Sequence, residues 1–450
     1  MAKNLLEWSN AVSGRVTQPD IESYGPRAAA VAEHLKTEVQ GGKLPCLNMP
    51  FWPALKTELA GCKEYFGRFE HLLLLGIGGS ALGARALQKA FFPQQDQPGH
   101  SGPWLWIADN VDAATLEAWF AKLPAEKTLL VVVSKSGDTI ETLSQYILAV
   151  QWLKKHCGEK WSEHVFCITD VAKGFLRQQA DAFSFKTLPV PDFLGGRYSV
   201  LSAVGLAPAT FLGLDAAALV QGALDANRAL LSPDLNGVTL AAHPAFKLAA
   251  WNCALMAKGY SQLIFFTYIP AWACFGAWFS QLWAESLGKG GKGSMPLPAV
   301  GVTDQHSLQQ MFLDGPRDKG CLFLSSPSLA AGPAFPAELP EIWSYLKGKH
   351  FGDLLQAEAL GTQMALAKTQ TPIVELRIGS VTLENAGRLM GLLMATTLIT
   401  GWLLEINPVD QPAVELSKRL AKSKLGAAGY GAESADLAAF LAKAGAGQEF

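Results

Sequence analysis

The sequence has no excess of charge of either sign. Its 450 residues include 37 Lys and Arg against 39 Asp and Glu, so the net charge is only −2 at pH 7. A near-neutral chain has no overall field that would attract nucleic acid or an anionic membrane. We therefore expect no nucleic-acid partner, and any anionic ligand must be held by a local arrangement of residues.

Paired cysteines are also missing. The seven cysteines are scattered and odd in number, and no two form a C-x-x-C pair: Cys46, Cys62, Cys157, Cys167, Cys253, Cys274 and Cys321. This pattern is typical of reduced thiols in the cytosol, and it argues against a disulfide framework or a zinc site. Residues 1–14 lack the basic start and apolar core of a signal peptide. We expect a cytoplasmic protein without a bound metal.

Long hydrophobic runs are few, and neither of the two candidates predicts a membrane span. Residues 263–283 contain Pro270, Ser280 and Gln281, and residues 390–404 are fewer than the ~20 that a span needs. Hydrophobic residues still make up 49% of the chain, which is enough for large buried cores. We expect both runs to be core elements and no contact with a membrane.

The sequence does contain several short apolar runs. Each is followed by small polar residues and then by a helical pattern. Residues 71–75 and 129–133 are typical of strands that are buried on both faces. Further strands are expected at 164–169, 261–269, 296–303, 320–326 and 371–377, and helices at 271–287 and 383–404. Strands that alternate with helices predict an α/β fold with parallel sheets.

This alternation predicts two α/β units between two extensions. The expected segments are a helical lead-in (1–60), a first α/β domain (61–215), a second α/β domain (230–405) and a C-terminal helical segment (406–450).

Two segments that join a strand to a helix are suited to binding an anion. The first, residues 76–83, is rich in glycine but lacks the G-x-G-x-x-G spacing of a dinucleotide site, and a tight turn explains it equally well. The second holds Ser134, Lys135, Ser136 and Thr139 at a helix start, which favours a phosphate monoester over an ordinary helix cap. Asp138 adds a negative charge there, which fits a phosphate only if its carboxylate points away.

Four further segments each present a candidate catalytic group. Arg197 follows two glycines, and arginine is a permanent donor to oxyanions. Glu285 closes an apolar helix, where desolvation suits a carboxylate to proton transfer near neutral pH. His306 offers an imidazole, and Lys418 follows Gln411 by seven residues, about two helical turns. Taken singly, each also fits a surface or structural residue.

The six segments together, in this order over residues 75–418, resemble the glucose-6-phosphate isomerase family. The Ser-x-Ser-x-x-Thr segment alone resembles the sugar isomerase (SIS) fold, a doubly wound unit that binds phosphosugars. The resemblance implies two SIS-type domains with parallel sheets, and an aldose–ketose isomerase that interconverts glucose 6-phosphate and fructose 6-phosphate through an enediolate. It implies a homodimer with shared active sites, and no cofactor.

The resemblance also implies a role for each residue. Ser134, Lys135, Ser136 and Thr139 would hold the 6-phosphate, and Gly79, Ser80 and Gly196 would line the sugar pocket. Glu285 would move the proton between C2 and C1, while Arg197 would stabilise the enediolate. His306, from the neighbouring subunit, and Lys418 would assist ring opening, and Gln281 and Gln411 would position the substrate.

Two other functions stay open at this point. A non-catalytic phosphosugar sensor on the same fold would keep the Ser134–Thr139 segment but lose the base or the arginine, whereas Glu285 and Arg197 are both present. An isomerase that also accepts mannose 6-phosphate differs only in small details of its pocket. An amide-transferring sugar synthase needs a cysteine after the first methionine, and residue 2 is alanine.

Overall fold

The computed structural model describes residues 3–443, 445 and 447 and consists of two units. The first unit ends at Pro408 and contains the ten described strands. The second unit begins at Val409 and contains α17 (Glu415–Lys424) and α18 (Gly431–Ala442). The finer predicted boundaries, at residues 60, 215, 230 and 405, stay a prediction.

Five parallel strands form the first sheet, in the order β3-β2-β4-β5-β6. They are β2 (His71–Leu75), β3 (Trp104–Ala108), β4 (Thr128–Ser134), β5 (Val165–Thr169) and β6 (Lys186–Pro189). The three inner strands are completely buried, as expected for parallel strands with helices on both faces. The sequence predicts these three but not the edge strands β3 and β6.

The second sheet has the order β1-β10-β9-β7-β8. Its strands are β1 (Leu5–Glu7), β7 (Gln262–Thr267), β8 (Met295–Val300), β9 (Lys319–Ser325) and β10 (Ile373–Arg377). The last four are parallel, whereas β1 pairs antiparallel with β10, with Leu6 opposite Leu376. The prediction of two parallel α/β units is thus confirmed, and the lead-in, which we expect to be helical, also supplies an edge strand.

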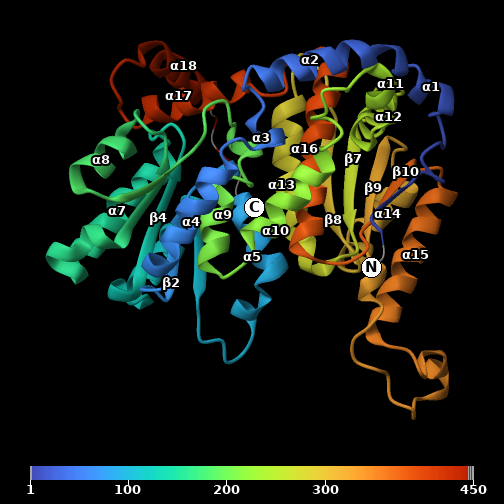
Figure 1. Ribbon diagram of the computed structural model, residues 1–450, viewed down its shortest axis with the longest axis horizontal. Helices are drawn as coiled ribbons and strands as arrows, with labels where there is room; N and C mark the ends of the chain where they lie inside the picture. Colours follow the sequence, from blue (N-terminus) through green and yellow to red (C-terminus); the bar gives the residue numbers. More distant parts are fainter. Residues whose placement is uncertain (1–2, 444, 446, 448–450) are drawn as a thin grey trace. The chain divides into compact units, whose positions relative to one another are not determined.

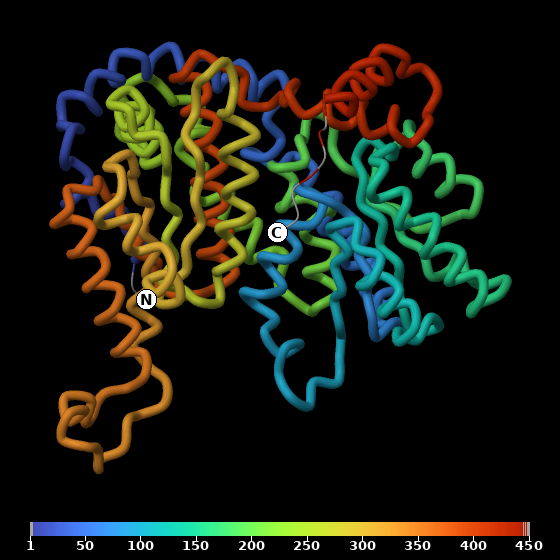
Figure 2. Tube along the Cα trace, turned by 180° about the vertical axis from the view of Figure 1, so that it is seen from behind, coloured from blue at the N-terminus to red at the C-terminus, as the bar shows by residue number. Residues whose placement is uncertain are grey.

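Helices connect the strands and cover both faces of each sheet (Figures 1 and 2). In the first unit they are α1 (Gln18–Glu22), α2 (Ala28–Gln40), α3 (Pro45–Asn48), α4 (Trp52–Phe66), α5 (Leu82–Phe91), α6 (Ala113–Lys122), α7 (Ile140–Cys157), α8 (Phe175–Phe183), α9 (Ala203–Phe211), α10 (Ala216–Asn227), α11 (Gly237–Ala242), α12 (Pro244–Ala257), α13 (Ala273–Leu287), α14 (Gln309–Asp314), α15 (Phe351–Lys368) and α16 (Leu383–Leu403).

Alternate residues of each central strand point to opposite helix layers. In β2, Leu72 and Leu74 join the core formed with α4, α5 and α9, whereas Leu73 and Leu75 join the core formed with α7 and α8. Strand β7 divides its side chains in the same way between two clusters. This period of two explains why the strands are apolar throughout.

Helix α16 contains most of the apolar run at residues 390–404, one of the two candidates for a membrane span. By length and composition alone, this one described helix could cross a membrane, but most of it is buried against other helices. It packs closely on α10, because a Cβ at Gly222 would lie 1.9 Å from the Glu384 carbonyl oxygen and one at Gly387 would lie 1.8 Å from that of Leu219. The helix is therefore a core element, as expected, although it is longer than the run of residues 390–404.

The strand order of the first sheet changes direction between β2 and β4. The chain passes from β2 outward to β3 and then returns to β4 on the other side of β2. In α/β sheets, ligands bind at the carboxyl ends of the strands at such a switch point. The two anion-binding candidates, residues 76–83 and 134–139, directly follow these two strands.

Candidate active site

The turn after β2 and the Gly-Gly-Arg turn pack backbone to backbone. They form two 3₁₀ turns, Gly78–Ser80 and Gly196–Tyr198. A Cβ added at Gly79 would lie 2.2 Å from the carbonyl atoms of Gly196, so no larger residue fits there. Ser199 Oγ donates to the Gly196 carbonyl oxygen at 2.7 Å and lies 3.4 Å from that of Gly79. The structure thus brings the first and third segments together.

Helix α13 adds Gln281 and Glu285 to these turns. The two residues are four apart and share one face of the helix, and Gln281 Nε2 donates to Glu285 Oε2 at 2.9 Å. A Cβ at Gly78, whose φ is +56°, would lie 2.9 Å from Gln281 Nε2. Ser80, which ends the same turn, is half-buried. The fourth segment therefore meets the first.

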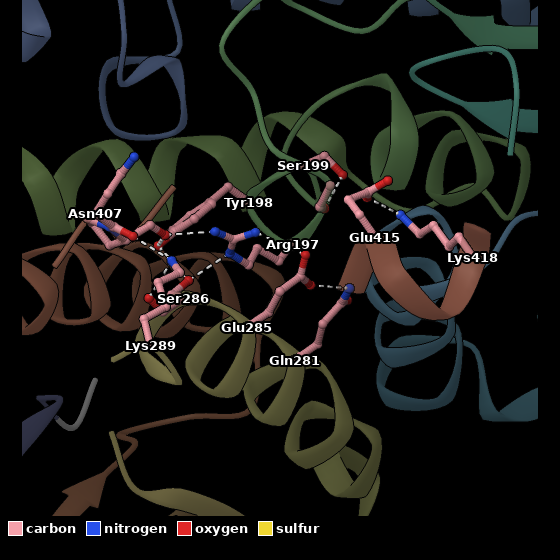
Figure 3. A network of polar contacts seen from close by, with 12 residues as sticks. Arg197, Tyr198, Ser199, Gln281, Glu285, Ser286, Lys289, Asn407, Glu415 and Lys418 are labelled. Carbon is pink, nitrogen blue, oxygen red and sulfur yellow. Dashed lines mark hydrogen bonds and ion pairs between the residues drawn. The ribbon is translucent and has the colours of Figure 1, made fainter. Parts of the chain in front are cut away.

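Described hydrogen bonds join Arg197 to two parts of the chain, helix α13 and the segment that follows α16 (Figure 3). Nε donates to Ser286 Oγ at 2.7 Å, Nη1 to Glu285 Oε1 at 3.0 Å and Nη2 to the Pro408 carbonyl oxygen at 2.8 Å. The Arg197 side chain is only 1% exposed. The alternative of a solvated surface arginine is therefore excluded.

The surroundings of Glu285 differ from the sequence-based expectation. An apolar helix predicts a carboxylate that burial desolvates, but the Glu285 side chain is 23% exposed and accepts hydrogen bonds from both Arg197 and Gln281. These two donors hold the carboxylate in place beside the two turns, and a carboxylate so positioned can serve as a general base. The apolar residues of α13 are buried on the other faces of the helix, and Glu285 faces polar groups.

The serine-rich segment after β4 forms a compact loop before α7. Ser134 is buried, and its Oγ lies 3.0 Å from Oγ1 of Thr139, the residue that precedes α7. Ser136 is exposed in the same loop. The loop therefore places hydroxyl groups at the positive end of an 18-residue helix, an arrangement that suits a phosphate.

Lys135 links this loop to the Gly-Gly-Arg turn. It is half-buried, and its Nζ donates to the carbonyl oxygen of Leu194 at 3.1 Å. Burial lowers the pKa of Lys135, and the nearby carboxylates of Asp192 and Asp170 oppose this shift only in part. When its amine is protonated, a lysine at this position can pair with a phosphate.

Asp138 does not add an unpaired charge to the loop. Its Oδ1 accepts a hydrogen bond from the backbone N–H of Phe175 at 3.1 Å, at the first residue of α8. Helix starts favour negative charge, so this carboxylate has its own partner. The Asp138 carboxylate is thus directed toward the start of α8. A bound phosphate in the loop requires that this carboxylate point away from it.

Comparison with known proteins places the chain among sugar phosphate isomerases. Residues 59–312 match the family described as phosphoglucose isomerase. The glucose-6-phosphate isomerase of Rubrobacter xylanophilus is 37% identical over 437 residues, which cover 95% of this chain and 98% of the relative. This chain belongs to the phosphoglucose isomerase family. A second relative, the glucose-6-phosphate isomerase of Thermus thermophilus, is 35% identical over 420 residues, covering 90% of this chain and 96% of its own.

Two solved structures resemble this member of the phosphoglucose isomerase family. A hypothetical protein from Thermus thermophilus gives a TM-score of 0.81 at 32% identity and covers 94% of this chain and 100% of its own. A glucose-6-phosphate isomerase from Chlamydia trachomatis gives 0.70 at 23% identity and covers 86% and 76%. The predicted α/β fold class, with two parallel-sheet units and helical extensions, is confirmed.

Among the described residues, His306 has no hydrogen-bonding contact with the cluster of Arg197, Gln281 and Glu285. It ends the 3₁₀ turn Thr303–His306 after β8, its side chain is exposed, and no described hydrogen bond joins it to Arg197 or Glu285. Gln305 fixes the turn by donating to Thr362 Oγ1 at 2.8 Å and to Glu358 at 3.1 Å, both in α15. His306 is thus presented outward from a well-held turn.

Gln411 and Lys418 belong to the second unit, which is described by itself. Pro412 begins the 3₁₀ turn Pro412–Val414, which runs directly into α17. Lys418 lies in α17 and forms an exposed 2.7 Å ion pair with Glu415. The participation of Gln411 and Lys418 in a phosphoglucose isomerase site therefore remains a prediction.

The segment that leads from α16 to the second unit is held by four cations. The carbonyl oxygens of Leu403, Leu404, Asn407 and Pro408 accept hydrogen bonds from Arg27, Lys292, Lys289 and Arg197, respectively. Cations at a helix C-terminus are favourable because the last carbonyls lack partners within the helix. Arg197 thus joins the site to this connection.

Two buried residues at the site are given no role by the sequence reasoning. Tyr198 OH lies 3.0 Å from Ser286 Oγ and donates to the Pro408 carbonyl oxygen at 3.3 Å. Burial raises the pKa of the Tyr198 phenol. Both residues directly follow predicted site residues in the chain, and this adjacency is the only signal that the sequence offers for them.

Proposed function

We propose that this protein is a glucose-6-phosphate isomerase, the activity for which its relatives from Rubrobacter xylanophilus and Thermus thermophilus are named. The observation that carries the proposal is the ion pair between the buried Arg197 and the partly exposed Glu285, next to the packed turns of Gly79 and Gly196. Aldose–ketose isomerisation needs a base, a cation that stabilises an oxyanion, and a group that holds the substrate at a distance from the reacting carbons.

The loop after β4 binds the 6-phosphate. Ser134, Ser136 and Thr139 supply hydroxyl donors, Lys135 supplies charge, and α7 supplies the positive end of its dipole. The phosphate lies far from C1 and C2, so its binding energy orients the sugar without taking part in the chemistry. Gly79, Ser80 and Gly196 line the sugar pocket.

Glu285 carries the proton between the two carbons. It removes the C2 proton of the open-chain aldose, a C1–C2 double bond forms, and the former carbonyl oxygen O1 takes the negative charge. Arg197 stabilises this enediolate. Return of the proton to C1, with transfer of the O2 proton to O1, gives the ketose. Because the aldose and the ketose are isomers and the step transfers no net electrons, no redox cofactor is needed.

The remaining candidate residues prepare the substrate. Gln281, which is hydrogen-bonded to Glu285, and Gln411 position the sugar. His306 and Lys418 assist ring opening, a step that needs one proton donor and one acceptor.

A second copy of this chain completes the site with His306 in a cytoplasmic homodimer. His306 is exposed on a turn that α15 holds. Between β9 and α15, residues 327–350 extend away from the sheet in both views (Figures 1 and 2). This segment exposes large apolar side chains, with Ile342 at 73%, Trp343 at 49% and Tyr345 at 64%. Grouped exposed apolar residues indicate an interface, and a two-fold symmetric partner presents the same segment in return.

A conversion assay tests the proposal. Purified protein is incubated with fructose 6-phosphate and a metal chelator, and the sugars are followed by proton NMR. We expect glucose 6-phosphate to accumulate until the two sugars reach equilibrium. Tight binding of fructose 6-phosphate without conversion would overturn the proposal in favour of a sensor. Appearance of mannose 6-phosphate would show that the pocket also accepts the C2 epimer.

A further inference from the structure

Ser286 is a buried hydroxyl beside the proposed base. It lies in α13 directly after Glu285, and its residue is completely buried. Its Oγ accepts from Arg197 Nε at 2.7 Å and lies 3.0 Å from Tyr198 OH. Figure 3 shows Ser286 and Glu285 on the same side of Arg197. One helix thus supplies two consecutive partners for the same guanidinium.

The Ser286 hydrogen bond holds the guanidinium at Nε, a nitrogen that the described bonds to Glu285 and Pro408 do not use. A guanidinium is planar, and Nε is the nitrogen through which the plane is attached to the side chain. Glu285 and Pro408 accept from the two terminal nitrogens, whereas Ser286 accepts from Nε. With acceptors at all three nitrogens, both the tilt and the rotation of the plane are defined.

Ser286 is in turn held by Tyr198. The Tyr198 hydroxyl lies within hydrogen-bond distance of both Ser286 Oγ and the Pro408 carbonyl oxygen, at 3.0 and 3.3 Å. All of these groups are buried, so water cannot readily replace a lost acceptor. A buried network with every member paired is rigid, and removal of one member leaves an unpaired donor.

We propose that Ser286 is a positioning residue that orients Arg197 toward the oxyanion of the enediolate. The inference rests on the proposed isomerase function. Negative charge develops on the sugar oxygen only as the C2 proton leaves, so a misdirected guanidinium weakens the transition state more than the bound substrate. Ser286 itself touches no reacting atom and acts only through Arg197.

Replacement of the hydroxyl separates this role from a general structural one. We expect Ser286→Ala to lower kcat about ten- to a hundred-fold, the usual cost of a hydrogen bond to a charged group, while KM changes by less than about three-fold. Ser280→Ala is the matched control, because its Oγ bonds only the Gly276 carbonyl oxygen within the same helix, at 2.9 Å. Ser280→Ala should retain the kcat of the unchanged protein.

A double-mutant cycle identifies Arg197 as the group through which Ser286 acts. Lysine has no Nε–H, so in an Arg197→Lys background the Ser286 hydroxyl has no donor to hold. We expect Ser286→Ala to lower kcat by less than about two-fold in that background. An equal loss in both backgrounds would overturn the proposal, as would an unchanged kcat of Ser286→Ala alone.

Two measurements keep the result interpretable. If Ser286→Ala unfolds, Ser286→Cys is used in its place, because a thiol is a weak hydrogen-bond acceptor of similar size. We then expect a kcat between those of the unchanged protein and an inactive variant. In the Arg197→Lys background, we expect Ser286→Cys to cause no further loss of kcat. A kcat of Ser286→Cys equal to that of the unchanged protein would overturn the proposal. If the unchanged protein fails to convert fructose 6-phosphate, the proposed function fails and not the positioning role alone.

Discussion

At the scale of single residues, Arg197 has the most constrained environment in the site. It joins the proposed base, a buried serine and the connection to the second unit through three hydrogen bonds. Lysine, with a single terminal nitrogen, could not serve three acceptors in these directions. A permanently charged donor fixed next to Glu285 is an arrangement that can stabilise negative charge as it develops during proton transfer.

If Lys135 holds the phosphate as proposed, we expect substrate binding to be sensitive to alkaline pH. Its pKa is below the ordinary value of 10.5 because of burial, so it loses its charge at a lower pH than an exposed lysine. Binding that depends on this charge is complete below the lowered pKa and weakens as pH rises through it. We expect KM for fructose 6-phosphate to rise on the alkaline side of neutrality and the Lys135→Arg variant to show this rise only at higher pH.

The measurement is KM as a function of pH, from neutrality to the ordinary pKa of lysine, with Lys173→Arg as a control in the neighbouring loop. An identical alkaline rise of KM in the Lys135→Arg variant and the unchanged protein would assign the effect to another group.

Site residues can be predicted from the sequence when their hydrogen-bond partners are close to them in the chain. Ser134, Thr139, Gln281 and Glu285 are within hydrogen-bond reach of a partner four or five positions away, so spacing alone suggests that they cooperate. Ser286 has its partner 89 positions away. A serine inside an apolar helix gives no sign of such a contact, and only the folded chain shows it.

At the scale of elements, the inner strands are predictable and the edge strands are not. Strands β2, β4 and β5 are continuous apolar runs because helices cover both of their faces. Strand β6 has four residues, including an exposed lysine and a proline, and β1 has three residues that pair with a strand near residue 375. Such short edges carry little pattern, and their pairing comes from tertiary contacts.

The connection after α16 depends on cations that belong to other elements. Lys289 donates to the Ser286 carbonyl oxygen at 2.9 Å and also to that of Asn407. We expect Lys289→Met to raise the rate of proteolytic cleavage within residues 404–415 about ten-fold, because about 1–2 kcal/mol of local stability is lost with hydrogen bonds from a charged donor.

Limited proteolysis with mass spectrometry measures this rate. Lys258→Met, which removes an ion pair with Asp20 at 2.8 Å and lies outside the connection, is the control. Equal cleavage rates in the Lys289→Met and Lys258→Met variants would show that the cation at residue 289 does not hold the connection.

At the scale of the whole molecule, the proposed site is assembled from distant parts of the sequence. The loops after β2 and β4 supply the proposed phosphate and sugar contacts, and α13, which follows β7, supplies Gln281 and Glu285. A sequence can place each segment at a strand or helix end, but which ends meet is decided by the packing of the two sheets. The proposed role of His306 in a second copy's site is harder still to infer from sequence, because its partner would belong to another chain.

Mixing two inactive variants tests whether His306 serves the partner's site. The His306→Ala and Glu285→Gln proteins are unfolded together, refolded and assayed. Random pairing of equal amounts makes half of the dimers mixed. If His306 acts across the interface, each mixed dimer has one site of two with both residues intact. About a quarter of the activity of the unchanged protein then returns. If His306 acts within its own chain, every site lacks one residue and activity stays at the level of the separate variants.

The central claim is that Glu285 transfers the proton through an enediolate, and isotope exchange tests it most directly. The unchanged protein, Glu285→Gln and the control Glu384→Gln are incubated with fructose 6-phosphate in deuterated buffer and followed by proton NMR. We predict glucose 6-phosphate with deuterium at C2 from the first and third proteins. We predict a rate about 10²–10⁴-fold lower from Glu285→Gln, with phosphosugar binding retained. Deuterium incorporation by Glu285→Gln at nearly the unchanged rate would contradict the account.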